Sequence, residues 1–503
     1  MTDRLTALAY HRLSSHSSVS VQTNRHFMDW DNQPLPFKIY PDLEPLPLPR
    51  EFARRAPGSG APLDRADLAR LLHYTGGIVR KKILDDGSEY YFRAAACTGA
   101  LYHIDLYVVC VDLADLEAGV YHFGPHDFAL RRLRAGDHRR VVVEATGDDA
   151  AAARAPIIVV ATSTFWRNAW KYQSRAYRHA FWDGGTMLAN LLETAAASDV
   201  ATRVLVGFAD DPVNELLGLD TKREVALACV TLGATDRAAP PPPAVTAVEY
   251  RTTPLSRDEV DYALIRSAHA GTTLDSPDDA RRFRGQAFNR VVADPVATLV
   301  PLASSDGVLA LPVEQAIARR GSARVFERAP ITGEHLSHIL RSSVIDIDAD
   351  WASPRATDGG AGPALLNDVY LIVNAVEGVA PGAYVYRREF HSLEPLKQGD
   401  FRREAGYLDL GQELAADASV NFYVLSDLPE VVEHLGDRGY RAAALEAGII
   451  GGRIYLAAYG LSGLGATGLT FFDDDVTTFF SPHAAGKAVM FLVAVGRPQR
   501  RGT

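Results

Sequence analysis

The residues best suited to chemistry stand in a short basic segment, RRGSARVF, that runs from Arg319 to Phe326. The helical-looking string VEQAIA precedes it, so the arginines and the serine would gather at a helix end. Guanidinium groups match phosphate oxygens in pairs and a hydroxyl adds one donor, so this spacing predicts a grip on a dianionic phosphate. The alternative is a solvated basic helix terminus that pairs with nearby acids. The segment alone leaves both interpretations open.

Composition argues against several other classes of site. The three cysteines, Cys97, Cys110 and Cys229, have no CxxC spacing, which predicts neither a disulfide framework nor a thiolate metal site. No spacing of histidines and carboxylates indicates a metal centre, so we expect no metal. A net charge of -10 gives no general attraction to nucleic acid or to an anionic membrane. The apolar runs have the length of a buried strand and are too short to span a membrane. We therefore expect a cytoplasmic protein that binds neither nucleic acid nor a membrane.

An internal duplication must position the basic segment. The string GVYHFGPHDFALRRLRAGD from Gly119 aligns with GAYVYRREFHSLEPLKQGD from Gly382, at an offset of 263 residues. The same offset holds without gaps from Tyr107 to Gly233, which indicates a repeat rather than coincidence. Like residues fall on like residues: Arg175, Arg178 and Asp210 on Arg438, Arg441 and Asp473. We expect the recurring arginines to neutralise acids inside each fold or to line the interface between the copies.

Each copy has the same order of expected elements. A buried strand (104–111; 369–375) is followed by a Gly-bounded hairpin. A second strand (157–162; 420–426) leads into a long amphipathic helix that begins near the paired arginines, and a closing strand (225–232; 488–495) ends the unit. Helices and strands are thus mixed in an α+β manner. No GxGxxG follows an opening strand, so a Rossmann domain is not indicated.

The chain divides into four expected segments. Residues 1–60 are rich in proline and polar groups and form an N-terminal arm that wraps another part of the fold. Domain 1 covers 61–237 and domain 2 covers 306–503. Between them, 238–305 begins with four consecutive prolines from Pro240, which predicts an extended linker, and continues as a polar, helical connector.

Several strings resemble those of one enzyme superfamily. RRGSARVF resembles the RRSxRxF motif that opens FMN-dependent nitroreductases. AAACTGALYHID (94–105) and WKYQSRAYR (170–178) resemble the PSxGALYPxE and WKYxxRxYR segments of the SagB-type dehydrogenases in that superfamily. RGYRAAALEAG from Arg438 and GLGATGLTFFDDD from Gly463 are also similar. The resemblance implies two fused nitroreductase-like domains, with mixed or antiparallel central sheets flanked by helices, that form an intrachain pseudo-dimer.

In that superfamily FMN lies between two subunits, one of which grips the phosphate while the other covers the ring. Carried over to this chain, the resemblance implies phosphate and ribityl contacts from one basic group: Arg319, Arg320, Ser322 and Arg324, assisted by Arg500 or Arg501. It implies ring contacts from two loops: the backbone of Ala466, Thr467 and Gly468 in copy two, and Cys97, Thr98, Gly99 and Ala100 in copy one. The family serine falls on Cys97, so a thiol replaces a hydroxyl there unless Thr98 substitutes.

Lys171 and Tyr172 match a Lys-Tyr pair that is implicated in catalysis in SagB-type azoline oxidases, and the resemblance implies the same role here. When a hydride leaves one carbon for the flavin, a proton must leave the neighbouring atom. A partly desolvated lysine, or a tyrosine beside it, is able to accept that proton. The alternative is that the two side chains cap backbone groups or extend to solvent at a strand-to-helix junction.

The repeat predicts that only one of two possible sites is complete. The offset of 263 places His434 and Leu435 opposite the Lys-Tyr pair, and Gly360 and Ala361 opposite Cys97 and Thr98. It places Pro57 and Ser59 opposite Arg320 and Ser322, and no RRxSxR string occurs in the first hundred residues. Copy two lacks the Lys-Tyr pair and copy one lacks the phosphate grip. We therefore expect one FMN per chain.

The resulting expectation is an FMN-dependent oxidoreductase. The resemblance implies oxidation of a thiazoline or oxazoline on a peptide or a carrier protein to the azole, with dioxygen reoxidising the flavin. One alternative is an NAD(P)H-dependent nitro- or quinone reductase. Another is a non-catalytic flavin-binding scaffold. The pseudo-dimer would act alone or form a further homodimer.

Overall fold

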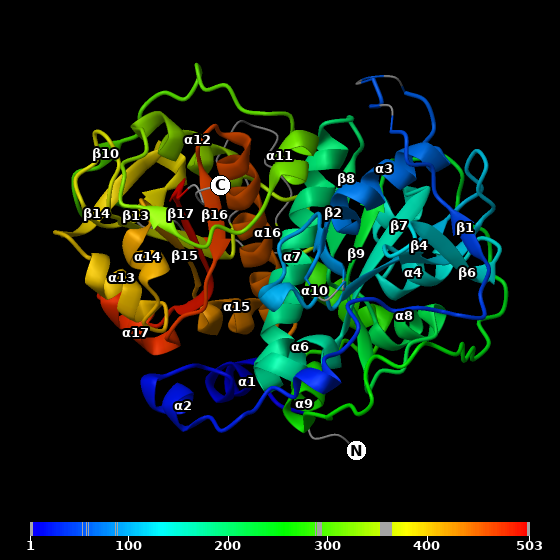
Figure 1. Ribbon diagram of the computed structural model, residues 1–503. Helices are drawn as coiled ribbons and strands as arrows, with labels where there is room; N and C mark the ends of the chain where they lie inside the picture. Colours follow the sequence, from blue (N-terminus) through cyan, green and yellow to red (C-terminus); the bar gives the residue numbers. More distant parts are fainter. Residues whose placement is uncertain are drawn as a thin grey trace.

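Two α+β units stand side by side, and the long central helix of each runs next to that of the other (Figure 1). The computed structural model describes residues 4–499 except 53, 57, 59, 86, 88, 287, 289–293 and 353–364. Across these described residues, no helix is long and apolar enough to cross a membrane.

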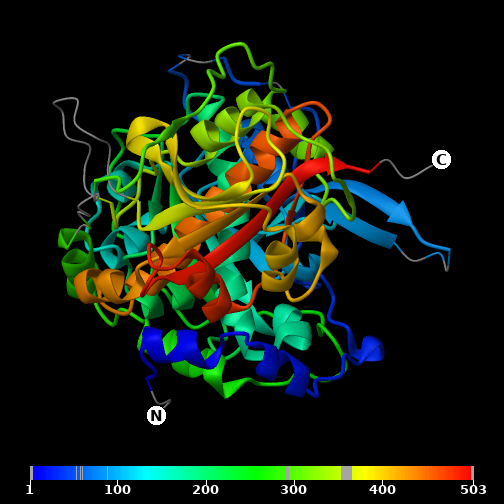
Figure 2. The same cartoon turned by 90° about the vertical axis from the view of Figure 1, so that its left-hand side faces the viewer.

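The first unit is built on an antiparallel sheet of strand order β1-β6-β5-β4-β7-β9-β8. Its strands are β1 (Pro45–Pro47), β4 (Ile104–Cys110), β5 (Gly119–Gly124), β6 (Ala129–Ala135), β7 (Ile157–Thr164), β8 (Thr202–Leu205) and β9 (Glu224–Leu232). A separate hairpin of β2 (Ile78–Ile83) and β3 (Glu89–Arg93) projects from the body (Figure 2). The α-helices are α1 (Ala7–Leu13), α2 (Ser18–Thr23), α3 (Arg65–Gly76), α4 (Arg139–Ala145), α5 (Ala150–Arg154), α6 (Phe165–Tyr172), α7 (Ala176–Ala196) and α8 (Asp210–Leu217). Short 3-10 turns are η1 (Trp30–Asn32), η2 (Thr98–Ala100) and η3 (Gln173–Arg175).

The second unit repeats this plan, with strand order β10-β14-β13-β12-β15-β17-β11 and β16 also paired to β17. Its strands are β10 (Val300–Pro301), β11 (Phe326–Glu327), β12 (Asn367–Val373), β13 (Gly382–Arg387), β14 (Ser392–Gln398), β15 (Val420–Ser426), β16 (Gly465–Gly468) and β17 (Ala488–Pro498). Its helices are α11 (Val313–Arg319), α12 (Gly333–Ser343), α13 (Arg402–Leu408), α14 (Glu413–Asp417), α15 (Leu428–Leu435), α16 (Gly439–Gly460), α17 (Asp473–Phe480) and the turn η4 (Arg388–Phe390). The connector between the units carries α9 (Ala263–Gly271) and α10 (Pro277–Gly285), which pack on α7 and α4 of the first unit.

The repeat holds at the level of single residues. β4 begins at Ile104 and β12 at Asn367, a shift of 263, and α7 and α16 differ by the same number. Even the irregularities recur, because a β-bulge between residues 161 and 162 returns between 424 and 425. The expected α+β fold of two fused units is confirmed.

The constant offset fails only before the first central strand. α3 begins at residue 65 and α12 at residue 333, a difference of 268, so the chain between these helices and the sheets differs in length. The gapless pairing of Pro57 and Ser59 with Arg320 and Ser322 therefore does not describe this region. Pro57 and Ser59, like Gly360 and Ala361, lie outside the described residues.

The two central helices are not amphipathic, contrary to expectation. All residues of α16 and nearly all of α7 are buried, because each helix packs against its own sheet and against the other helix. Glycine permits the close crossing. A Cβ on Gly185 would lie 2.6 Å from the Cα of Gly448, which is the same position of the other copy. Helices that are enclosed on every side need apolar or paired residues all round.

The recurring arginines line the interface between the copies, as one of the two interpretations predicted. Asp473 of copy two pairs with Arg175 and Arg178 of copy one. Reciprocally, Asp210 of copy one lies 2.7 Å from both Arg438 and Arg441. All six side chains are buried. The N-terminal arm crosses the same interface, because the backbone N–H of His16 donates to Asp473.

Candidate functional site

Helix α11 carries the basic segment of copy two onto the surface of copy one. Ile317 of this helix packs in a cluster with Ala94 of copy one, and Glu314 pairs with Arg70 on α3. The helix ends at Arg319, so the segment that follows lies where the two copies meet.

The guanidinium of Arg320 holds the first copy directly. Its Nε donates to the carbonyl of Ala94 (2.9 Å), and Nη2 donates to those of Arg93 (2.7 Å) and Ala95 (3.1 Å). Arg320 is buried, so these charge-assisted bonds are shielded from water. Most of the donors of this guanidinium are therefore already engaged with backbone.

The other members of the basic segment face outward. Arg319, Ser322 and Arg324 are exposed, and the described part of the chain offers neither arginine side chain an acidic partner. The Ser322 hydroxyl lies 3.5 Å from that of Tyr455. Arg500 and Arg501 lie outside the described residues. The segment thus presents two unpaired cations and a hydroxyl at the junction of the copies.

Strand β16 runs beside this segment. The N–H of Ala323 donates to the carbonyl of Ala466 (3.0 Å), and the N–H of Gly468 donates to the hydroxyl of Tyr455. Thr467 between them is buried. Tyr455 and Tyr459 on α16 lie with nearly parallel rings, 6.4 Å between centroids. Sequence reasoning missed this pair, although two tyrosines one helical turn apart were the available signal.

The loop of copy one that follows β3 is held by Asp183 on α7. The carboxylate accepts hydrogen bonds from the Cys97 thiol (3.2 Å), the Thr98 N–H (2.9 Å) and the Thr98 hydroxyl (2.8 Å). His103 Nε2 lies 2.8 Å from the same carboxylate. The side chains of Cys97 and Thr98 therefore turn inward, while Gly99 is exposed and Ala100 partly so. Asp183 was also missed; an acid at the same repeat position in both apolar helices, Glu446 in the second, was the signal.

Cys97, His103 and Asp183 bring three possible metal-ligand atoms within 4.8 Å of one another. Their chemistry fits a hydrogen-bonded network better. Burial, and then the charge of Asp183, raises the pKa of Cys97 well above its ordinary value. The neutral thiol donates to the Asp183 carboxylate and so forms part of that network.

Tyr172 meets this loop from the end of α6. A Cβ on Gly99 would lie 2.9 Å from the Tyr172 hydroxyl, and Gly99 has a φ of 65°, so only glycine fits there. Burial, and then Asp183 and Cys97, raises the pKa of Tyr172. Its phenol is therefore neutral over the physiological range and able to donate a hydrogen bond.

Lys171 lies beside the tyrosine. Its Nζ is 5.4 Å from the centre of the Tyr172 ring, and both side chains are half-buried. Among the residues that the structure describes, no carboxylate pairs with Lys171.

The predicted residues of the two copies therefore meet. From Arg320 the contacts run to Ala95, along the loop to Gly99, and from Gly99 to Tyr172. Ala466 and Ser322 border the same junction from copy two. The basic segment of copy two and the phenol of copy one are thus connected through the loop of residues 95–99.

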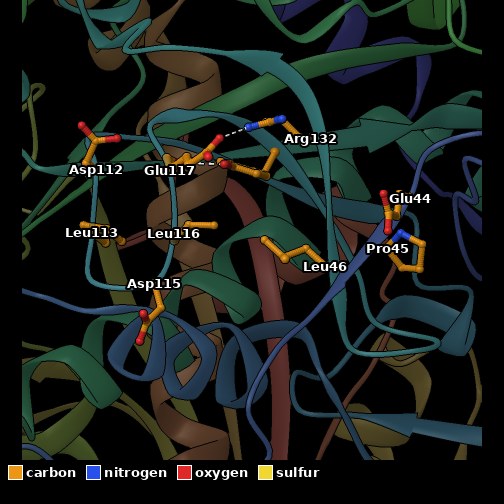
Figure 3. Close-up of a pocket in the computed structure, with 10 residues that line it drawn as sticks. Glu44, Pro45, Leu46, Asp112, Leu113, Asp115, Leu116, Glu117 and Arg132 are labelled. Carbon is orange, nitrogen blue, oxygen red and sulfur yellow. Dashed lines mark hydrogen bonds and ion pairs between the residues drawn. The ribbon is translucent and has the colours of Figure 1, made fainter.

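A separate cavity of about 780 Å³ opens at the far edge of the first sheet (Figure 3). Its walls come from β1, β6 and the β4–β5 connection, including Leu46, Leu116 and Arg132, which pairs with Glu117. None of the predicted site residues lines it. A smaller cavity of about 350 Å³ borders Trp166 and Ala169 on α6.

Comparison with known proteins covers both copies. The nitroreductase family profile matches residues 59–234 and 317–497. A crystal structure provisionally assigned as a nitroreductase from Anabaena variabilis is 26% identical, with a TM-score of 0.78 over 99% of this chain and 100% of that one. A protein of Methanocaldococcus jannaschii, also provisionally assigned as a nitroreductase, is 28% identical over 33% of this chain and 81% of its own.

The similarity to the E. coli microcin synthetase McbBCD complex with truncated pro-MccB17 is weaker: 23% identity and a TM-score of 0.31 over 37% of this chain and 71% of that one. Such a likeness says nothing about substrate. The family profile, in contrast, spans most of both repeated units. This chain therefore belongs to the nitroreductase family.

Proposed function

We propose that the chain is an FMN-dependent oxidoreductase with one composite site to which both copies contribute. The observation that carries the proposal is the contact of Arg320 with the carbonyls of residues 93–95, because it joins the basic segment of copy two to the loop that reaches Tyr172. The donor set fits FMN: unpaired arginines and a hydroxyl suit a phosphate, and the exposed glycines Gly468 and Gly99, one in each copy, allow a planar ring to approach the backbone.

The residues divide into three roles. Arg319, Ser322 and Arg324 would hold the phosphate and ribityl chain, with Arg500 or Arg501 as further donors. Arg320 would mainly fix the first-copy loop, because its guanidinium is occupied by carbonyls. The ring would lie between two backbone segments: Ala466, Thr467 and Gly468 on one side, and Cys97, Thr98, Gly99 and Ala100 on the other.

Bound FMN would supply a two-electron hydride acceptor. Lys171 would take the proton that the substrate loses from the neighbouring atom, and the neutral phenol of Tyr172 would donate a hydrogen bond that orients the substrate. With a thiazoline or oxazoline substrate, loss of one hydride and one proton gives the aromatic azole. The SagB-type assignment and this substrate class rest on the resemblance of residues 94–105 and 170–178.

A large substrate is supported by an apolar surface beside α6. Trp30 of the N-terminal arm is 61% exposed and lies edge-on to Trp170, 5.1 Å between ring centroids. Exposed aromatic side chains near a site favour contact with a peptide or a carrier-bound group. Three free cysteines are consistent with the cytoplasm as the compartment.

Removing the unpaired arginines tests the phosphate grip. The double change Arg319→Ala with Arg324→Ala is expected to weaken FMN binding by about 100-fold or more, since hydrogen bonds to charged groups contribute roughly 1.5–3 kcal/mol each. FMN retained after gel filtration and titration of apoprotein would measure it. Arg328→Ala is the matched control, because Arg328 is equally exposed but pairs with Asp417. Unchanged FMN affinity in the double variant contradicts the assignment.

One observation favours a second function, reduction of a nitro compound or quinone with NAD(P)H. Burial raises the pKa of Tyr172 and keeps its phenol neutral, so the hydroxyl can donate a hydrogen bond to the oxygen of a nitro group or a quinone as well as to a substrate that is oxidised. Under anaerobic conditions we expect no bleaching of the flavin by NADH or NADPH within a catalytic turnover, and bleaching by a thiazoline peptide. Rapid bleaching by either nicotinamide would support the reductase instead. Protein that purifies colourless and takes up no FMN would favour a non-catalytic scaffold.

A further inference from the structure

The repeat creates a second position that corresponds to the proposed flavin site. β8 there takes the place of β16, and Glu446 takes the place of Asp183, each at the offset of 263. Residues 348–352, between α12 and β12, lie across this position. The N–H of Val204 donates to the carbonyl of Asp348 (2.8 Å), and the N–H of Asp350 donates to that of Val204 (3.1 Å). The outer edge of β8 is thus covered by the chain itself.

Asp350 uses the backbone donors that follow β8. Its carboxylate accepts from the N–H groups of Val206 (3.1 Å) and Gly207 (2.7 Å), and its side chain is almost completely buried. Burial raises the pKa of Asp350 to about 6 despite these two donors. The backbone N–H groups that directly follow β8 are therefore satisfied by a side chain of the chain itself.

Trp351 fills the adjoining volume. Its indole is 1% exposed, and Nε1 donates to Glu446 at 3.1 Å. The rings of Phe283 and Phe288 lie nearby. A Cβ on Gly207 would lie 2.6 Å from Phe283, and Phe288 lies 5.5 Å from His434, the residue opposite Lys171. Phe283 and Phe288 are both buried.

The corresponding stretch of copy one behaves differently. Between α3 and β4 the chain forms the β2–β3 hairpin, which projects away from the body (Figure 2). Ile83 in this hairpin is 70% exposed, so the hairpin does not fold back over the junction. The β2–β3 hairpin of copy one thus projects away from the first position, whereas residues 348–352 of copy two lie across the second.

We infer that Asp350 and Trp351 occupy the second copy of the site from inside the chain, the carboxylate on the backbone donors and the indole in the space of a planar ring. The inference rests on the proposed flavin function of the first site. It gives a structural cause for a single flavin per chain, which the missing residues of the second site alone do not. It also predicts which ligands would bind in the space left when the Trp351 side chain is removed. These are small planar heteroaromatic molecules without a phosphate.

The test combines flavin content with chemical rescue. FMN-loaded wild-type protein is expected to contain one FMN per chain. Trp351→Gly should keep that ratio, lose about 5 °C or more in melting temperature, and regain much of the loss with saturating indole, because a ligand that binds only the folded state stabilises it. Trp30→Gly, which removes an exposed tryptophan, should show neither the loss nor the rescue.

Two FMN per wild-type chain would overturn the inference, and so would Trp351→Gly protein that indole does not stabilise. If Trp351→Gly does not fold, Trp351→Phe is the second variant, because it retains a ring and loses only the bond to Glu446. It should fold and show a smaller loss in melting temperature. A melting temperature equal to or above that of wild type would overturn the inference. Failure of the proposed function is distinguishable, since protein without any FMN could still show rescue by indole.

Discussion

Replacing Tyr172 by phenylalanine is expected to lower kcat by about 100-fold or more while FMN content stays unchanged. The change removes only the hydroxyl that lies against the loop at Gly99. The ring, and its edge-on contact with His179 at 4.7 Å, would remain. Steady-state kinetics on FMN-loaded protein would measure the effect. Full turnover in this variant would remove Tyr172 from the mechanism.

Lys171→Met should lower kcat by a similar factor, since the side chain keeps its length but loses the amine. Lys82→Met is the matched control, because Lys82 is an exposed lysine on the projecting β2–β3 hairpin. The pH profile separates the two residues. Because the pKa of Tyr172 is raised, its phenol should stay protonated beyond pH 10, and no loss of activity below that pH should come from its ionisation. A tyrosine-dependent limb near pH 8 would contradict the neutral phenol.

Changing Asp473 to asparagine should lower the free energy of unfolding by about 3–5 kcal/mol, because it leaves two buried arginines without a counter-charge. Burial works against the carboxylate, but Arg175 and Arg178 together hold the pKa of Asp473 well below its ordinary value. The stabilisation is therefore complete at neutral pH and is lost only in acid, as the pH falls below about 3.9 and through the folded-state pKa. Urea unfolding at pH 7 would measure the difference.

The pseudo-symmetry supplies internal controls for this result. Asp210→Asn should cost a similar amount, since Asp210 binds Arg438 and Arg441 in the same arrangement. Asp474→Asn, at an exposed neighbour of Asp473, should change stability by less than about 0.5 kcal/mol. If Asp473→Asn were as mild as Asp474→Asn, the interface arginines would not depend on this carboxylate.

Much of the fold could be predicted from local patterns. Apolar runs marked β4, β7 and β12 to within a few residues, because a strand buried on both faces needs a continuous apolar sequence. The repeat predicted two units and drew attention to Arg175 and Arg178. It did not show that α7 and α16 cover each other, because a helix that is apolar all round indicates burial but does not identify the element that encloses it. The length change before β4 also escaped a gapless alignment.

For the site, residue types and spacing indicated which groups are chemically competent: the arginines after α11, the loop at Cys97 and the pair at Lys171. Only the folded chain decided their tasks. It engaged Arg320 with the carbonyls of residues 93–95, turned Cys97 toward Asp183 and placed Trp351 at the second position. These contacts join residues 80 or more positions apart, and no local periodicity encodes them. They follow from how the two copies pack. Packing removes water from the interface, and each buried hydrogen-bond donor must then find an acceptor within the protein.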